Sequence, residues 1–428
     1  MEQKRNPGPW LGQVRKNSGS FAQGQKQVVN KHVQRQRKRT CISRDNPTGN
    51  NWSDIHPLTF TDGDCFYAGY SFPGRDSVSG GESRLLSGNY EGGEAVAFMR
   101  FTGMPREGYF EIPSGYQDST YLELTLVKRS PLERNPVDLL VYKLDQSWAA
   151  DSTDMISDAN LTQITFEAFS VPDSVSSDGT VIQLPLPMEE IENWYSDSDT
   201  LGLSLAVKTG DDSYVEILAA ETGRGPKIFF KYRNVDDLPD DEDSVYDQRS
   251  TRDSYRVVAG QAPLQENIWE IANISPSRLY VNFLVDYTKF TDMEGTALDS
   301  ISLKQATVNH AELIFFIKEN PYYTGTSQYS LRGDRVRDSV SVATPVEISD
   351  AEVASGLISQ ALVQGDSLVV NITPIIQAYS SGDSENWGVV IRSMQEMLNF
   401  GRLELWHFTD APEDKKPKLR VTYTPPFL

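Results

Sequence analysis

The sequence lacks the long apolar runs, the cysteines and the histidines that several classes of protein require. No stretch of about 18 uncharged apolar residues occurs, so a membrane-spanning helix is not expected. The 428 residues include only two cysteines, Cys41 and Cys65, and four histidines. These small numbers exclude a dense disulfide scaffold and a cysteine-rich zinc site, and the histidines are not spaced as pairs of metal ligands. We therefore expect neither a metal nor an organic cofactor.

Motifs that mark catalysis are also missing. The sequence contains neither Gly-x-Ser-x-Gly nor a Gly-x-x-x-x-Gly-Lys-Ser/Thr phosphate loop. Acid pairs such as Asp62 and Asp64 fall in predicted strands or turns, where solvated carboxylates are the ordinary interpretation. The sequence therefore predicts a protein that is not an enzyme.

Charge is distributed unevenly along the chain. The formal net charge is −20, but residues 1–40 carry ten Lys or Arg and one acid, whereas the rest carries 30 basic and 59 acidic groups. Residues 1–56 are predicted to form a basic, mostly irregular N-terminal arm with its lead-in, because they contain too little apolar surface to bury. The predicted contact residues of this arm are Arg35, Arg37, Lys38 and Arg39.

These cations suit phosphate, an acidic membrane surface or the acidic body of another copy of the chain. The strong negative charge of the body argues against nucleic acid as a partner. A solvated tail or a processing remnant is the alternative interpretation of the arm. The arm has no apolar segment of the length that a secretory signal peptide needs.

From residue 57 onward the pattern is that of an all-β protein. Short runs rich in β-branched and aromatic residues alternate with clusters of Gly, Pro, Asp and Ser. Leu122, Leu124 and Leu126 alternate with other residues and would share one face of a half-buried strand. Helical periodicity is confined to Met188–Trp194 and Thr373–Tyr379, each with a proline near its start. This pattern favours an antiparallel β-sandwich.

One order of elements occurs twice. Each half has an opening strand (95–101 and 279–285), further apolar strands, a short amphipathic segment, a Gly-led strand and a closing Pro-Lys-aliphatic strand (226–232 and 417–423). Repetition over such a long period indicates tandem domains. We predict a first β-sandwich at 57–233 and a second at 253–428.

Residues 234–252 are predicted to be an acidic linker. Seven acids lie between Asp236 and Asp247, with almost nothing apolar among them. Such a stretch is solvated and repels itself. Calcium binding is the alternative, although the acids lack the spacing of an EF-hand loop.

The repeated order of strands, amphipathic segment, Gly-led strand and closing Pro-Lys-Leu strand resembles the DNRLRE-domain family. The resemblance covers roughly residues 95–232 and 279–424. It implies two tandem jelly-roll-like antiparallel β-sandwiches, similar to carbohydrate-binding modules, in exported bacterial surface proteins. It also implies an extracellular or cell-surface location. It transfers no functional residue position by position.

A few residues are candidates for binding or cross-linking. Trp148, Tyr322 and Tyr323 are predicted to lie in loops, where an exposed aromatic ring can stack on a sugar. Cys41 and Cys65 are close enough in sequence to form one disulfide in an oxidising compartment. Arg332-Gly333-Asp334 matches the tripeptide that integrins recognise, but such a tripeptide more often marks a turn.

Together these features favour a non-catalytic structural or adhesive protein that self-associates through its β-sandwiches and its basic arm. The expected partners are other copies of the chain, in a homo-oligomer or a filament. One alternative is a carbohydrate-binding surface protein whose partner is a polysaccharide. A second is a capsid-like shell protein whose arm faces nucleic acid.

Overall fold

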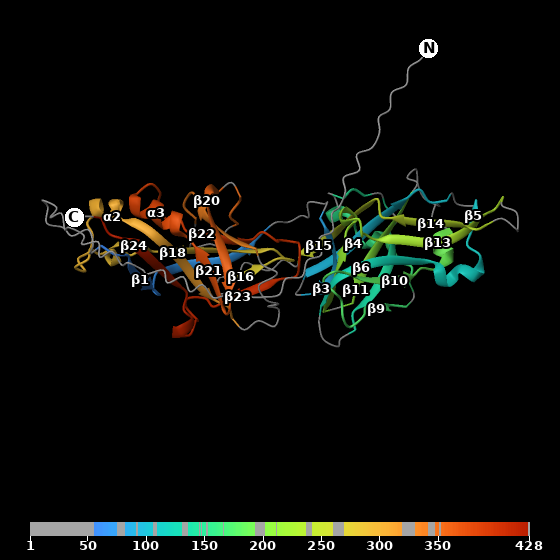
Figure 1. Ribbon diagram of the computed structural model, residues 1–428, viewed down its shortest axis with the longest axis horizontal. Helices are drawn as coiled ribbons and strands as arrows, with labels where there is room; N and C mark the ends of the chain where they lie inside the picture. Colours follow the sequence, from blue (N-terminus) through green and yellow to red (C-terminus); the bar gives the residue numbers. More distant parts are fainter. Residues whose placement is uncertain are drawn as a thin grey trace, which may run out of the picture. The chain divides into compact units, whose positions relative to one another are not determined.

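The computed structural model describes residues 55–426 apart from 75–81, 91–92, 106–108, 131–135, 145, 147, 151–152, 166, 193–201, 211, 237–241, 260–268, 319–329, 341–346 and 351. The chain divides into two compact units, residues 1–53 and 54–428. All described residues belong to the second unit, and the fold below is that of this unit (Figure 1).

The described residues are mostly β-strand, and all strand pairs among them are antiparallel, as the alternating pattern predicted. The α-helices are short: α1 (Met188–Glu192), α2 (Ser300–Gln305) and α3 (Thr373–Ser381). Helices α1 and α3 confirm the two predicted helical segments. Short 3-10 helices occur at Ser114–Ser119, Thr153–Met155, Asp158–Asn160, Ala220–Thr222, Tyr287–Lys289 and Glu413–Lys415.

The first sheet, called the N-terminal sheet, has the order β14-β13-β6-β12-β3-β4-β11-β7-β8. Four further strands branch from it: β5 pairs with β13, β9 with β7, β10 with β6 and β15 with β4. Its strands are β3 (Arg84–Tyr90), β4 (Gly93–Thr102), β5 (Phe110–Glu111), β6 (Tyr121–Ser130), β7 (Asp138–Leu144), β8 (Leu161–Gln163), β9 (Phe169–Ser170), β10 (Thr180–Pro185), β11 (Gly202–Thr209), β12 (Ser213–Leu218), β13 (Lys227–Asn234), β14 (Ser244–Arg249) and β15 (Arg252–Ala259).

The second sheet, called the C-terminal sheet, has the order β1-β24-β18-β21-β20-β19-β22-β17-β16-β23, and β2 pairs with β17. A bridge between Ile317 and Leu405 brings the end of β18 to β23, so this sheet curls back on itself. Its strands are β1 (Leu58–Asp62), β2 (Phe66–Pro73), β16 (Trp269–Ala272), β17 (Ser277–Phe283), β18 (Thr307–Phe316), β19 (Leu331–Val336), β20 (Val353–Gln364), β21 (Ser367–Asn371), β22 (Val389–Ser393), β23 (Arg402–Leu405) and β24 (Lys418–Thr424).

The two sheets repeat one scheme of strand pairing. Strand β6 pairs with β10 and β13, as β18 pairs with β21 and β24. Strand β11 lies between β4 and β7, as β22 lies between β17 and β19. Strand β3 pairs with β4 and β12, as β16 pairs with β17 and β23. The repetition seen in the sequence is therefore also a repetition of strand pairing.

The predicted boundaries of the first β-sandwich, 57–233, need correction at both ends. Strand β1 pairs with β24 and β2 pairs with β17, so 58–73 belongs to the C-terminal sheet (Figure 1). Strand β14 pairs with β13 and β15 pairs with β4, so 244–259 belongs to the N-terminal sheet. The predicted acidic linker thus contains β14 and the start of β15, because backbone pairing to β13 and β4 outweighs its local polarity.

Each sheet encloses a hydrophobic core, to which its strands contribute the residues that alternate toward the inside. Leu122, Leu124 and Leu126 are fully buried in the N-terminal core, on the shared face that the alternation predicted. Helix α3 buries Ile375 and Ile376 in the C-terminal core. Truncating such side chains to alanine costs about 2–5 kcal/mol each.

The turn after β22 joins the two cores. Phe400 is buried with the N-terminal core and stacks on Tyr214 of β12 at 4.3 Å between ring centroids. In the same turn, the carbonyl of Met397 accepts a hydrogen bond from the Tyr255 hydroxyl of β15 at 2.8 Å. The two sheets therefore share buried side chains.

Candidate functional site

The most distinctive feature of the described chain is the place where the β1–β2 pair (residues 58–73) adds to the C-terminal sheet. We call the receiving strands, β24 and β17, together with the loop that covers β2 (the cover loop, residues 347–350 and 352–353), the docking site. The pair comes from a segment that precedes the N-terminal sheet in the sequence. The docking site therefore shows this protein accepting strands from a distant part of the chain.

Strand β1 lies against β24 in register from Leu58 opposite Tyr423 to Asp62 opposite Leu419. Its alternation turns Phe60 toward Phe290 and Tyr423, with ring centroids 5.1 and 6.1 Å away. On the other face, the hydroxyls of Thr59 and Thr422 are 2.8 Å apart and exposed. One face of β1 thus adds aromatic packing, and the other stays in solvent.

Strand β2 packs on both sides of β17. Phe66 enters the C-terminal core beside Trp269, Phe283 and Phe315 at 5.7–6.1 Å. On the opposite face, Tyr70 and Phe72 form a second buried cluster. Because β2 is buried on both faces, removing it would expose two apolar layers.

Gly69 of β2 lies directly on the ring of Trp269. A Cβ atom at position 69 would be 2.7 Å from Trp269 Cζ2, closer than packed carbon atoms approach. Trp269 is fully buried against Phe66, Phe315, His407 and Phe408. The glycine therefore allows the close approach of β2 to the core, a use of glycine that is typical within strands.

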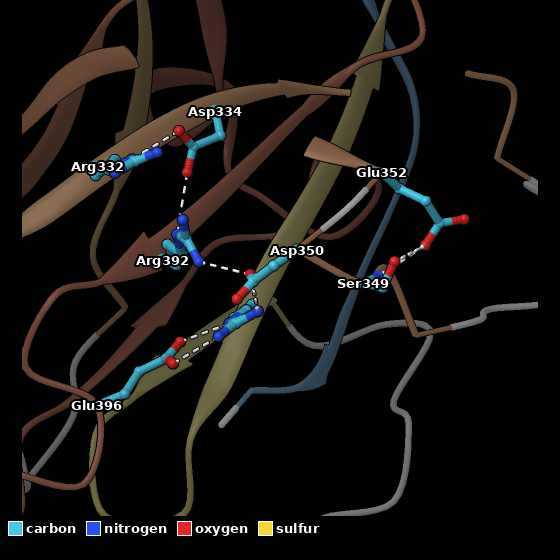
Figure 2. Close-up of polar contacts among 8 residues, drawn as sticks. Arg332, Asp334, Ser349, Asp350, Glu352, Arg392 and Glu396 are labelled. Carbon is cyan, nitrogen blue, oxygen red and sulfur yellow. Dashed lines mark hydrogen bonds and ion pairs between the residues drawn. The ribbon is translucent and has the colours of Figure 1, made fainter. Parts of the chain in front are cut away.

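The outer cluster of β2 is covered by Ile348 and Val353 of the cover loop. Ser349 caps this loop locally, since its N–H and its hydroxyl donate to Glu352 at 2.7 and 2.8 Å. The loop is fastened to the strands through Asp350, which accepts from Arg392 Nη1 at 2.7 Å and from Arg278 Nη1 at 3.1 Å. Figure 2 shows Asp350 and Arg392 in contact, with Asp334 on the other side of Arg392.

This ionic network pairs three arginines with three carboxylates (Figure 2). Glu396 accepts two hydrogen bonds from Arg278, at 2.7 and 2.8 Å. Asp334, which is fully buried, accepts from Arg332 at 2.6 Å and from Arg392 at 3.0 Å. Buried charges are stable only when they are paired in this way. Although burial lowers the pKa of Arg278, the hydrogen bonds and the negative charges of Glu396 and Asp350 together outweigh burial and raise that pKa.

The tripeptide Arg332-Gly333-Asp334 lies inside this network, within strand β19. The prediction that this tripeptide forms a turn is therefore wrong. Asp334 has no exposed surface and its carboxylate is held by two arginines. An integrin-type partner cannot reach it in this fold.

The N-terminal sheet holds β15 in an equivalent way. Its cover is the segment after β7, where Ser254 donates to the Ala150 carbonyl and Thr153 donates to the Tyr255 carbonyl, both at 2.9 Å. Asp253 of β15 accepts from the Ala220 N–H at 2.8 Å and from the Ser250 hydroxyl at 3.0 Å. Burial raises the pKa of Asp253 to about 6 despite these donors.

The prediction that Trp148 stacks on a sugar is wrong. Trp148 lies in the cover of the N-terminal sheet, only 6% exposed, beside Phe98 with ring centroids 6.0 Å apart. Its indole N–H donates to the Ser204 hydroxyl at 2.9 Å. The sequence placed it correctly after a strand but could not show that the loop folds back over the sheet.

The other predicted site residues give partial results. Tyr322 and Tyr323 lie outside the described residues, as do Cys41 and the arm residues Arg35, Arg37, Lys38 and Arg39. Cys65 is described as a buried free thiol whose Sγ lies 3.4 Å from the Asp62 carbonyl. Burial, and then the nearby Asp62, raises the pKa of this thiol to about 12.

Sequence reasoning missed the residues that build the docking site. Gly69 inside a strand pattern was a usable signal, because a glycine there often marks close backbone approach. Arg278, Arg392 and Glu396 gave no local signal, because their partners are distant in the sequence: Arg278 and Glu396 lie 118 residues apart, and Arg392 lies 42 residues from Asp350 and 58 from Asp334. Among the described residues, no group of three or more His, Cys, Asp or Glu side chains is arranged to hold a metal ion.

In the part of the chain that the structure describes, no helix is both long and apolar enough to cross a membrane.

Comparison with known proteins gave no match, either to a family model or to a curated protein. The resemblance to the DNRLRE-domain family therefore remains a prediction from the sequence pattern.

Proposed function

We propose that this chain is a non-catalytic structural or adhesive protein of a cell surface or extracellular assembly. In this proposal its two sheets are jelly-roll-like sandwiches of the DNRLRE type. Copies associate through these sandwiches and through the basic arm. The observation that carries the proposal is the docking site, because it is a surface built to receive strands from elsewhere.

Two properties of the docking site support a role in assembly. It recognises backbone through the ladders of β24 and β17, and it recognises side chains through the buried positions of Phe66, Tyr70 and Phe72. Strand addition of this kind combines the affinity of main-chain hydrogen bonds with the specificity of side-chain pockets.

Charge supports a second contact, between the arm of one copy and the body of another. The arm is strongly basic, and the rest of the chain carries about twice as many acids as bases. Carboxylates such as Asp154 and Asp212 are exposed on the surface of the body. Exposed ion pairs are screened over about 8 Å at physiological ionic strength, so salt is expected to weaken this contact.

Sedimentation of the full chain at low and high salt tests the proposal. We expect oligomers at low salt that dissociate as salt is added. Deleting residues 1–40 should shift the distribution toward smaller species. A matched variant that keeps the length, with Arg35, Arg37, Lys38 and Arg39 all changed to Gln, separates charge from chain length. A full chain that stays monomeric in every condition would contradict self-association.

The same preparations test the alternatives. An absorbance ratio at 260 and 280 nm typical of bound nucleic acid would favour the capsid-like alternative. Retention on a glycan array would favour carbohydrate binding, for which the burial of Trp148 removes one predicted stacking residue.

A further inference from the structure

The two strand pairs that add to the sheets are equivalent. Strand β1 lies on β24 as β14 lies on β13, and β2 lies on β17 as β15 lies on β4. Even the registers correspond: Phe60 faces Val421 and Tyr246 faces Phe230, at matching positions of the closing strands. Both sheets therefore have the same place for an added strand pair.

This equivalence defines a rule of connection. Strands β1–β13 form one sequence repeat and β14–β24 form the next. The first two strands of the second repeat complete the sheet of the first repeat. The first two strands of the first repeat complete the sheet of the second. Each repeat thus gives its leading strand pair away, and the described unit is closed by a reciprocal exchange.

We propose that the β1–β2 pair is also exchanged between copies of the chain, so that the pair of one copy occupies the docking site of another. This inference rests on the proposed function and names its partner, a second copy of this chain. The contacts are those already described, from Phe60 on Tyr423 to Phe66 beside Trp269. Repetition of one such heterologous contact produces a head-to-tail series, which stays open unless a ring closes.

The connection of the pair to the body permits the exchange. Residues 74–83 join β2 to β3, and ten residues span at most about 35 Å. On its other side the pair follows residues 1–57 of the chain, and residues 74–83 alone lead from it to the N-terminal sheet. The pair is therefore tied to the N-terminal sheet by a single connection, whereas β14 is the next strand after β13 in the sequence and is also paired with it.

Concentration decides between the closed and the exchanged forms. The buried contacts are the same in both, so the difference lies in the linker. A short linker supplies an effective concentration in about the millimolar range, so dilute chains close on themselves. Copies exchange their β1–β2 pairs when they fold at about that concentration or are already held together in an assembly. Because Phe66 and Tyr70 are buried, exchange is expected to occur mainly during folding.

A disulfide between β1 and β24 shows whether the β1 that pairs with β24 belongs to the same chain or to another copy. Thr59 and Thr422 face each other on the exposed side, and opposed residues of an antiparallel pair have the Cα separation that a disulfide needs. The double variant T59C/T422C is made in the full chain with Cys41 changed to Ser. It is refolded from urea at about 1 μM to about 1 mM, the range around the effective concentration of the linker. After oxidation, non-reducing electrophoresis separates cross-links within a chain from cross-links between chains.

A second reporter, T61C/R420C, lies two residues along the same strands and guards against a folding defect in the first. The control is K231C/V245C, which joins opposed residues of β13 and β14. It should give monomers at every concentration, because β13 and β14 are consecutive strands of the chain and pair with each other.

We expect both β1–β24 reporters to give monomers in dilute refolding, and dimers with a ladder above them at high concentration and in the assembled fraction. An assembled fraction that contains only cross-links within chains would overturn the exchange and leave self-association standing. The absence of any assembled fraction would overturn the proposed function together with this inference. Chain-to-chain bonds in the β13–β14 control at the same yield would mean random collision and would also overturn it.

Discussion

The substitution Gly69→Ala tests how closely β2 must approach the C-terminal core. The new Cβ would lie 2.7 Å from Cζ2 of Trp269 and 2.9 Å from Cε2 and Nε1. Relief requires a shift of about 1 Å, since packed carbon atoms lie about 3.5–4.0 Å apart. The indole cannot give way easily, because it is fully buried among other aromatic rings. Overpacking of a filled core costs about 1–3 kcal/mol, and we expect the upper half of that range.

Urea unfolding followed by tryptophan fluorescence measures this cost, with hydrogen exchange as the local readout. Amides of β24 and β17 should lose protection, whereas those of β13 and β14 should not. Gly63→Ala is the matched control, because nothing lies within 4 Å of a Cβ placed there. The reasoning fails if Gly69→Ala unfolds within about 0.5 kcal/mol of the parent, or if the control is equally destabilised.

Three further outcomes follow from buried polar groups. Asp253 has a folded pKa of about 6, above its unfolded value, so its protonation favours the folded state, and the free energy of unfolding should fall as pH rises from about 4 to about 6. Asp253→Asn should remove that fall and raise the free energy of unfolding by up to about 3 kcal/mol at pH 7. Urea titrations of the parent and the variant at pH 4 and pH 7 measure this, and equal stabilities of the two proteins at both pH values would contradict it. Asp334→Ala should cost about 3–5 kcal/mol of stability, because it leaves two arginines without their buried partner. Asp350→Ala should cost less than about 1 kcal/mol, because the Asp350 side chain is 68% exposed. Equal urea midpoints for the two variants would contradict this difference. In a chain with Cys41 changed to Ser, the buried Cys65 should not react with a thiol reagent at pH 8 until urea unfolds the protein, and rapid reaction of the native chain would disprove its burial.

Local patterns predicted the strands well, because a strand buried on one face needs an apolar residue at every second position. The three leucines of β6 are buried as their spacing required. Helix α1 begins directly after Pro187, and helix α3 has Pro374 in its first turn. The prediction failed at Trp148 for a different reason. Its burial depends on a loop folding back over Phe98, and nothing in the adjacent residues encodes that contact.

The acidic segment shows the same limit. Counting charges between Asp236 and Asp247 predicted a solvated linker, yet Ser244–Arg249 forms β14. Only Tyr246 of that strand is buried, in contact with Phe230 at 5.0 Å between ring centroids. One buried side chain and a backbone ladder suffice to hold an edge strand, and composition does not reveal either.

The sequence by itself determined where most of the strands lie, that their order occurs twice, and that the chain joins a basic arm to an acidic body. Periodicity and charge are local properties, so they can be read without knowing the fold. Only the tertiary structure decided that residues 58–73 complete the C-terminal sheet while residues 244–259 complete the N-terminal one. Both pairs alternate in the same way and suit equivalent positions, so the choice between the two sheets depends on long-range contacts such as Gly69 on Trp269 and Tyr255 beneath its cover.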